Sequence, residues 1–205
     1  MTKMIYDLKE YLKLGNIPRI PLLEGMYKEV INQITIDGLW LEFGVFKGES
    51  STEILSHDKT KKQILYGFES FLGMEEDLTP NNPKGICSLD YRPVYHTNVC
   101  LIEGLVQNTL VPFLKEHLNE PIAFANLDMT YSPTYYTLKT LTEYKTLVKG
   151  SIIVIQQAIR EEDKVIYDNN HKAFIEVAKE FNLKFKYIVC SEPNEPGLHI
   201  GIKIL

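Results

Sequence analysis

The sequence is poor in cysteine: its 205 residues include only Cys87, Cys100 and Cys190. An odd number of cysteines without close pairs fits neither a disulfide framework nor a zinc site. Cys100 and Cys190 lie in apolar runs, so we expect both to be buried core thiols. Since this cysteine pattern does not require an oxidising compartment, we expect a cytoplasmic protein.

Long apolar runs and clusters of basic residues are also missing. The most apolar stretch, residues 151–155, has only the length of a strand, whereas a membrane-spanning helix needs about 20 apolar residues. The N-terminal residues mix charged and apolar positions as an amphipathic helix does, unlike a signal peptide. The net charge is −5, and binding of nucleic acid needs clustered cations. We therefore expect a small-molecule partner, with neither membrane nor nucleic acid, and self-association into a homo-oligomer stays open.

The sequence does contain an alternation of short apolar runs with helical patterns. The runs lie at residues 39–43, 64–68, 99–102, 122–127 and 152–155, with helical patterns at 49–56, 106–117 and 134–148. Such alternation predicts a doubly wound parallel sheet with helices on both faces. After a helix at 170–181, two runs at 184–189 and 199–204 follow without a helix between them, which favours an antiparallel pair. The prediction is a Rossmann-like α/β fold: a seven-stranded, mostly parallel sheet with a terminal antiparallel strand.

Length and organisation indicate a single domain over residues 1–205. Apolar residues at helical spacing over 4–14 and 21–34 predict an N-terminal helical cap at 1–36. Residues 71–98 form a long irregular segment rich in proline, glycine and asparagine. Long loops in compact domains are usually functional or disordered. This segment is therefore predicted to be a lid or substrate loop, and a mobile surface insertion is the alternative.

The strongest local motif is LEFGVFKGES at residues 41–50, where the first predicted strand gives way to a helix. Gly44 and Gly48 permit a tight turn and a closely approaching ligand. Glu42 would repel a phosphate but attract the cationic end of an amino acid. The G-x-x-x-G spacing also lacks the middle glycine of the dinucleotide-binding fingerprint. The motif thus favours S-adenosylmethionine over a pyrophosphate, and a tight turn without a ligand is the simpler alternative.

A second carboxylate, Glu69, ends the next predicted strand, about 20 residues after Gly48. The carboxyl ends of parallel strands border the ligand crevice of an open α/β sheet, where a carboxylate accepts hydrogen bonds from ribose hydroxyls. Glu69 is therefore a ribose-binding candidate, and a solvated loop residue is the alternative.

With these motifs in this order, the sequence resembles the macrocin O-methyltransferase family of class I S-adenosylmethionine-dependent methyltransferases over nearly its whole length. The matching segments are LEFGVFKGES at 41–50, YGFESFLGMEED at 66–77, PKGIC at 83–87, EGLVQNTLVPFL at 103–114 and NHKAF at 170–174. The resemblance implies the class I methyltransferase fold, S-adenosyl-L-methionine as cofactor and S-adenosyl-L-homocysteine as product.

The resemblance also implies a cofactor site. The turn after the first strand would hold the methionine portion, the end of the second strand the ribose, and the loop after the third strand the adenine. These three groups are, in that order, Glu42, Gly44, Phe46, Gly48 and Ser50; Glu69 and Ser70; and Gly104 and Leu105. Asp128, at the end of the fourth strand, is expected to be a catalytic carboxylate or one that contacts the cofactor.

The sequence departs from the family at the metal site. The family reads IDCDLYSST after the fourth strand and VFDEY or VFDDY after the fifth, and these carboxylates hold Mg²⁺. Here residues 127–134 read LDMTYSPT and residues 155–158 read IQQA, so Asp128 remains while Gln156 and Gln157 replace the second carboxylate pair. Mg²⁺ is usually bound through one or two carboxylates together with substrate oxygens. We therefore predict no functional metal.

Without a metal, a hydroxyl acceptor needs a general base. Asp128 is the best-placed candidate, and His96 and His171 are the others, although histidines at such positions are more often surface residues. The leading hypothesis is a metal-independent methyltransferase that acts on oxygen of a sugar or another small polar molecule. A protein that binds the cofactor but has lost catalysis is the alternative. An NAD-linked oxidoreductase is disfavoured by the missing glycine and the terminal antiparallel pair.

Overall fold

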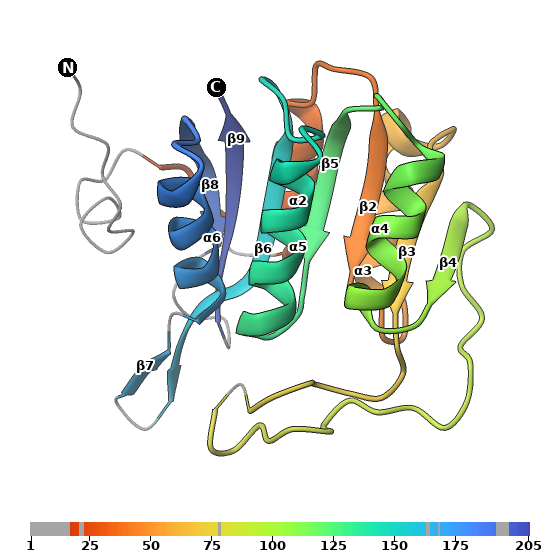
Figure 1. Cartoon of the computed structure of the whole chain (residues 1–205), viewed down its shortest axis with the longest axis vertical. Coiled ribbons are helices and arrows are strands. Elements are labelled where there is room, and N and C mark those ends of the chain that lie inside the picture. Colours follow the sequence, from red (N-terminus) through yellow and green to blue (C-terminus); the bar gives the residue numbers. More distant parts are fainter. Residues whose placement is uncertain (1–16, 21–22, 78, 163–164, 168, 192–196) are drawn as a thin grey trace.

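The computed structural model describes residues 17–20, 23–77, 79–162, 165–167, 169–191 and 197–205 (Figure 1). The helix predicted at residues 4–14 lies outside the described residues. The described chain forms one sheet with helices on both of its faces, as predicted (Figure 1). None of the described helices is long and apolar enough to cross a membrane.

The strand order confirms the doubly wound prediction. Seven strands lie in the order β4-β3-β2-β5-β6-β9-β8. They are β2 (Leu39–Phe43), β3 (Leu65–Glu69), β4 (Val99–Glu103), β5 (Ile122–Leu127), β6 (Ile152–Glu162), β8 (Phe185–Ser191) and β9 (Leu198–Ile204). Strands β4, β3, β2, β5 and β6 run parallel to one another. β9 is antiparallel to both β6 and β8. The antiparallel end follows from the absence of a crossover helix between β8 and β9.

Two short strands extend this sheet beyond the prediction. β1 (Arg19–Ile20) pairs parallel with β8, so the predicted cap at residues 1–36 contains a strand as well as a helix. β7 (Val165–Tyr167) pairs antiparallel with the end of β6, and the two form a hairpin that projects from the sheet (Figure 1). This hairpin is why β6 continues well past residue 155. Two or three residues are too few to show strand periodicity in a sequence.

The helices cover the sheet in two layers. α2 (Leu23–Asn32) and α3 (Glu49–Ser56) lie on one face, while α4 (Val106–Glu116), α5 (Tyr131–Glu143) and α6 (Asn169–Glu180) lie on the other (Figure 1). Each helix layer packs on its own apolar core, and neighbouring residues of the central strands alternate between the two cores. Trp40 and Phe124 enter the core under α2 and α3, and Leu41 and Ala125 enter the core under α4, α5 and α6. β2 and β5 are therefore buried along their whole length, as their continuous apolar sequences predict.

Two local predictions need correction. Cys100 is exposed, whereas Cys190 is buried as expected, because Cys100 lies on β4 at the edge of the seven-stranded arrangement. α5 spans Tyr131–Glu143 and not residues 134–148. It starts earlier because Pro133 is tolerated in a first helical turn, and it stops earlier because Lys145 adopts a left-handed φ of 57°.

A buried hydrogen-bond network joins α2 to the middle of the sheet. The hydroxyl of Tyr27 donates to Oδ1 of Asn126 (3.0 Å) and accepts from Nε2 of Gln156 (2.9 Å). Asn126 also donates from Nδ2 to Glu42 (3.0 Å). All four side chains are buried. Because an unpaired buried polar group is costly, this network fixes α2 against β2, β5 and β6.

We predict that Tyr27→Phe lowers the free energy of unfolding by about 1–2 kcal/mol, because Gln156 and Asn126 lose a buried partner. Urea denaturation measures this change. Tyr91→Phe is the matched control, since Tyr91 is 51% exposed. Equal stabilities of the two variants would show that the Tyr27 hydroxyl does not support the network.

Candidate functional site

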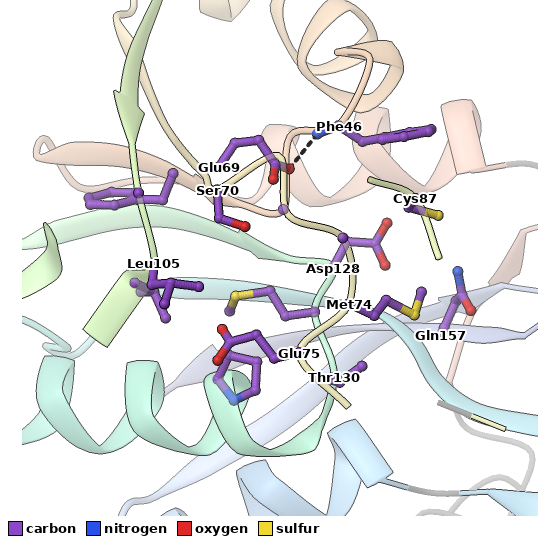
Figure 2. Close-up of a pocket in the computed structure, with 17 residues that line it drawn as sticks. Phe46, Glu69, Ser70, Met74, Glu75, Cys87, Leu105, Asp128, Thr130 and Gln157 are labelled. Carbon is purple, nitrogen blue, oxygen red and sulfur yellow. Dashed lines mark hydrogen bonds between the residues drawn. The ribbon is translucent and has the colours of Figure 1, made fainter. Parts of the chain in front are cut away.

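A cavity of about 280 Å³ lies where β2, β3, β4 and β5 end (Figure 2). Small-molecule sites commonly measure roughly 300–1,000 Å³, so this cavity is at the small end of that range. Its walls come from the turns after these strands, the long loop, the starts of α4 and α5, and β6. The lining residues are Gly44, Phe46, Phe68, Glu69, Ser70, Gly73, Met74, Glu75, Cys87, Gly104, Leu105, Val106, Asp128, Met129, Thr130, Pro133 and Gln157.

The structure brings part of the predicted site together at this cavity. The predicted residues that line it are Gly44, Phe46, Glu69, Ser70, Gly104, Leu105 and Asp128. Five others are absent from the lining: Glu42, Gly48, Ser50, His96 and His171. The long loop and β6 contribute residues that sequence reasoning did not select, among them Met74, Cys87 and Gln157.

The fold itself requires a glycine at residue 44, before any ligand is considered. Its φ of 83° is left-handed, and a Cβ at this position would lie 2.2 Å from the carbonyl oxygen of Asp128. The backbone of the two turns is held in register because Asp128 donates its N–H to Phe43 (2.9 Å) and Gly44 donates to Phe68 (3.0 Å). A side chain at residue 44 would therefore push the turns after β2 and β5 apart before it blocked any ligand.

Glu69 binds the turn after β2 directly. One carboxylate oxygen accepts the N–H of Phe46 (2.8 Å), drawn as the dashed line in Figure 2, and the other accepts the N–H of Phe71 (2.7 Å). A carboxylate offers about four acceptor positions, so two remain for a ligand. The N–H of Phe46 is in turn occupied by a carboxylate. This turn therefore lacks a free amide at the point where a dinucleotide's pyrophosphate would need one.

Glu42 lies behind the cavity wall. It is fully buried and accepts hydrogen bonds from the hydroxyls of Ser50 and Ser51 as well as from Asn126. Burial raises the pKa of the Glu42 carboxyl to about 7, and these hydrogen bonds oppose that rise. The expected contact with the cationic end of an amino acid is thus replaced by contacts that tie β2 to the first turn of α3. The sequence shows a carboxylate at residue 42, but it does not show in which direction that side chain points.

Gly48 serves packing of the long loop. The ring of Tyr95 lies against it, since a Cβ on Gly48 would come within 2.6 Å of that ring. The hydroxyl of Tyr95 donates to the carbonyl of Phe46 (2.6 Å). Burial raises the pKa of Tyr95 to about 12, so this hydroxyl remains a donor at neutral pH. The long loop therefore covers one side of the turn at Phe46 and Gly48.

The long loop at residues 71–98 forms part of the cavity wall. Met74, Glu75 and Cys87 face the cavity (Figure 2). Glu75 accepts a hydrogen bond from Nε2 of Gln107 on α4 (2.8 Å). Glu76 accepts the backbone N–H of Ser132 (2.6 Å) and its hydroxyl (2.9 Å), which caps the N-terminus of α5.

Left-handed backbone conformations gather around the cavity. Among the described residues other than glycine, seven have a positive φ. Three of them, Asn119, Lys145 and Asn182, follow the ends of α4, α5 and α6, where such a conformation is common. Of the other four, Phe46, Cys87 and Gln157 line the cavity, and Phe71 directly follows the lining residue Ser70. Large or polar side chains in this region of backbone space are costly and concentrate at functional sites.

Asp128 carries the most distinctive electrostatics of the cavity. Its carboxylate makes no hydrogen bond and no ion pair with the described part of the chain, and it points into the cavity (Figure 2). Burial raises the pKa of Asp128 to about 6, and the charge of Glu69 adds to the rise. Glu69, Glu75 and Asp128 all line the cavity, whereas no Lys, Arg or His of the described residues does.

The remaining predicted groups lie elsewhere. His96 is exposed, and its Nδ1 accepts the N–H of Asn98 (3.1 Å). His171 is buried, with its Nε2 2.8 Å from the hydroxyl of Tyr187. Neither histidine lines the cavity. Asp128 is therefore the general-base candidate that the structure places at the site.

The cavity does not fit a Mg²⁺ ion. Gln157 lines it, but Gln156 is directed into the buried network with Tyr27. Nowhere in the described ranges do three or more His, Cys, Asp or Glu side chains gather as metal ligands. One unpartnered carboxylate and one amide are a weak ligand set for this hard cation.

We predict that Glu42→Gln changes how stability depends on pH. The folded-state pKa of Glu42 is about 7 and the ordinary value is 4.5, so between these pH values the unfolded chain loses the proton first. The wild-type free energy of unfolding therefore loses on the order of 2 kcal/mol from this group as pH rises from 4.5 to 7, and the variant does not. Urea denaturation across this window measures the difference.

The comparison between proteins isolates Glu42. Burial lowers the pKa of His199 to about 4, which makes the protein more stable as pH rises from there, but this contribution is common to both proteins. Glu49→Gln, at an exposed position on α3, is the control. Parallel pH profiles for wild type and Glu42→Gln would contradict the assignment.

No protein-family model and no curated protein matches the sequence. Solved structures do match the fold. Calicheamicin methyltransferase CalS11 superposes with a TM-score of 0.64 at 19% identity, over 98% of this chain and 80% of that one. The O-methyltransferase NovP gives 0.58 at 14% identity, over 86% and 78%. An O-methyltransferase from Bacillus cereus in complex with SAH gives 0.54 at 14% identity, over 100% and 93%. The chain therefore has the Rossmann-like fold that these methyltransferases share.

Proposed function

We propose that this protein is an S-adenosylmethionine-dependent methyltransferase that acts, without a metal ion, on a hydroxyl oxygen of a sugar or another small polar molecule. The observation that carries the proposal is the unpartnered carboxylate of Asp128 in an acidic cavity at the ends of the parallel strands. The O-methyltransferases of the same fold support it, as does the resemblance of the motifs to the macrocin O-methyltransferase family.

The lining residues fit this cofactor. Phe68, Leu105 and Val106 offer apolar surface for the adenine, beside Gly104. Ser70 and the free acceptor positions of Glu69 suit the ribose hydroxyls. The methionine portion would lie along the turn of Gly44 and Phe46. When bound, S-adenosylmethionine supplies a methyl group on a positively charged sulfur, and an acidic lining without a cation suits that charge.

Asp128 would act on the acceptor. A hydroxyl oxygen that gains a methyl group must lose its proton, and Asp128 is the carboxylate that is free to take it. A pKa of about 6 makes this group a stronger base than an ordinary aspartate while leaving it ionised near pH 7. Positioning of the acceptor supplies the remainder of the acceleration. We take the loop at residues 71–98 to be the lid that closes over the reactants.

The second candidate is a protein that binds the cofactor without catalysis. It is favoured by Gln156 and Gln157, which stand where the resembling family has carboxylates. Both candidates need the same cofactor cavity. They differ in whether any hydroxyl compound becomes methylated.

Calorimetric titration with S-adenosylmethionine, with and without Mg²⁺, tests the cofactor site. We expect micromolar binding that Mg²⁺ does not change, and at least about tenfold weaker binding by Glu69→Gln, because that variant loses two charge-assisted hydrogen bonds that shape the turn. Glu116→Gln is the control, since Glu116 is exposed at the end of α4 and does not line the cavity. Absence of binding by the wild type would reject the proposal, and binding that requires Mg²⁺ would reject the metal-free site.

Methyl transfer to a panel of sugars, phenols and amines separates the two candidates. Transfer to any hydroxyl compound identifies an enzyme. We then expect Asp128→Asn to lower the turnover rate by about 100-fold or more, the usual contribution of a general base, with little change in thermal unfolding. A variant as active as the wild type would remove Asp128 from catalysis.

A further inference from the structure

The three carboxylates of the cavity are not equivalent. Both oxygens of Glu69 accept backbone N–H groups, and Glu75 accepts the side-chain amide of Gln107. Asp128 has no such donor within the described ranges, and burial raises the pKa of its carboxyl. An ionised carboxylate in such a place is stabilised chiefly by a cation that enters with a ligand.

Within the described part of the chain, the elements around Asp128 supply little positive charge to it. The N-terminus of α5 begins three residues later, but Glu76 occupies the N–H of Ser132 and Pro133 has no N–H. The other titratable groups that act on Asp128 or lie beside it are acidic or weakly acidic: Glu69 on β3, Glu42 on β2, Cys87 and Glu75 on the long loop, and Tyr27 on α2. Lys47 is exposed, and its ammonium lies 5.1 Å from the ring centre of Phe46.

Resting on the proposed function, we propose that Asp128 is the counter-charge for the sulfonium of S-adenosylmethionine, so that the cavity binds the cationic cofactor more tightly than its neutral-sulfur product. The cofactor and product share their adenosine and amino-acid parts, so contacts with Glu69, Ser70 and Leu105 do not distinguish them. Only a group that interacts electrostatically with the sulfur can distinguish the cofactor from the product. The same carboxylate opposes any ligand that places an anionic group at this end of the cavity.

Calorimetric titrations with three adenosine ligands test this assignment. S-adenosylmethionine has a positive sulfur, S-adenosylhomocysteine a neutral one, and adenosine 5′-monophosphate a phosphate at the same end of the ribose. For the wild type we expect dissociation constants that increase in this order, with the first two separated by about tenfold or more, as for a close charge pair. In Asp128→Asn we expect this separation to fall to about twofold or less.

The ratio between two ligands is the decisive quantity, because a general loosening of the fold weakens both alike. Asp128→Ser is a second variant in case the amide distorts the turn. Glu49→Gln removes one exposed negative charge outside the cavity and is expected to leave the ratio unchanged. Equal affinities in the wild type, or a preference for the cofactor that survives both Asp128 variants, would overturn the assignment. If no adenosine ligand binds the wild type, the proposed function itself fails, which is a different result.

Discussion

The turns after β2 and β5 approach each other at Gly44 and Asp128 so closely that no side chain fits between them. This contact sets the geometry of the whole site. It places the N–H of Phe46 within reach of Glu69 on the next strand, and it directs the side chain of Asp128 into the space that remains. The positions of three strand ends thus depend on one backbone contact. The cavity and its converging polar groups lie beside this contact, at the carboxyl ends of the parallel strands.

Two carboxylates of this chain show how environment separates structural from chemical roles. Burial raises the pKa of both Glu42 and Asp128, but Glu42 is fully buried whereas Asp128 is partly exposed. Glu42 receives three side-chain hydrogen bonds and connects β2, β5 and α3. Asp128 receives none from the described residues and faces the cavity. The first carboxylate is satisfied by the protein, and the second faces the cavity, where a ligand can bind it.

Much of the fold could be predicted from the sequence because its central strands are continuous apolar runs. The predicted residues 39–43 and 122–127 coincide with β2 and β5, which are buried on both faces. β1 and β7 were missed because strands of two or three residues have no readable periodicity. The exposure of Cys100 depends on which strand lies at an edge, and that is a property of the assembled sheet.

The site was less accessible to sequence reasoning. Gly44, Glu69 and Asp128 could be selected because each stands where a predicted strand ends. The inward direction of Glu42 and the packing of Tyr95 on Gly48 depend on contacts between segments far apart in the chain. The left-handed backbone of Phe46, Cys87 and Gln157 runs against residue preference, so no local pattern predicts it.

The long loop is attached to the rest of the molecule by a different kind of contact from those that hold the sheet together. Its connections to Gln107, Ser132 and Glu103 are polar and lie near the surface, where each such contact contributes only about 0–1 kcal/mol. The sheet is held by two continuous apolar cores. The chain is thus divided into regions of unequal local stability. The loop that we propose as the lid could thus open locally while the sheet stays folded, and raising the salt concentration weakens the Arg92–Glu103 ion pair that would oppose such openings.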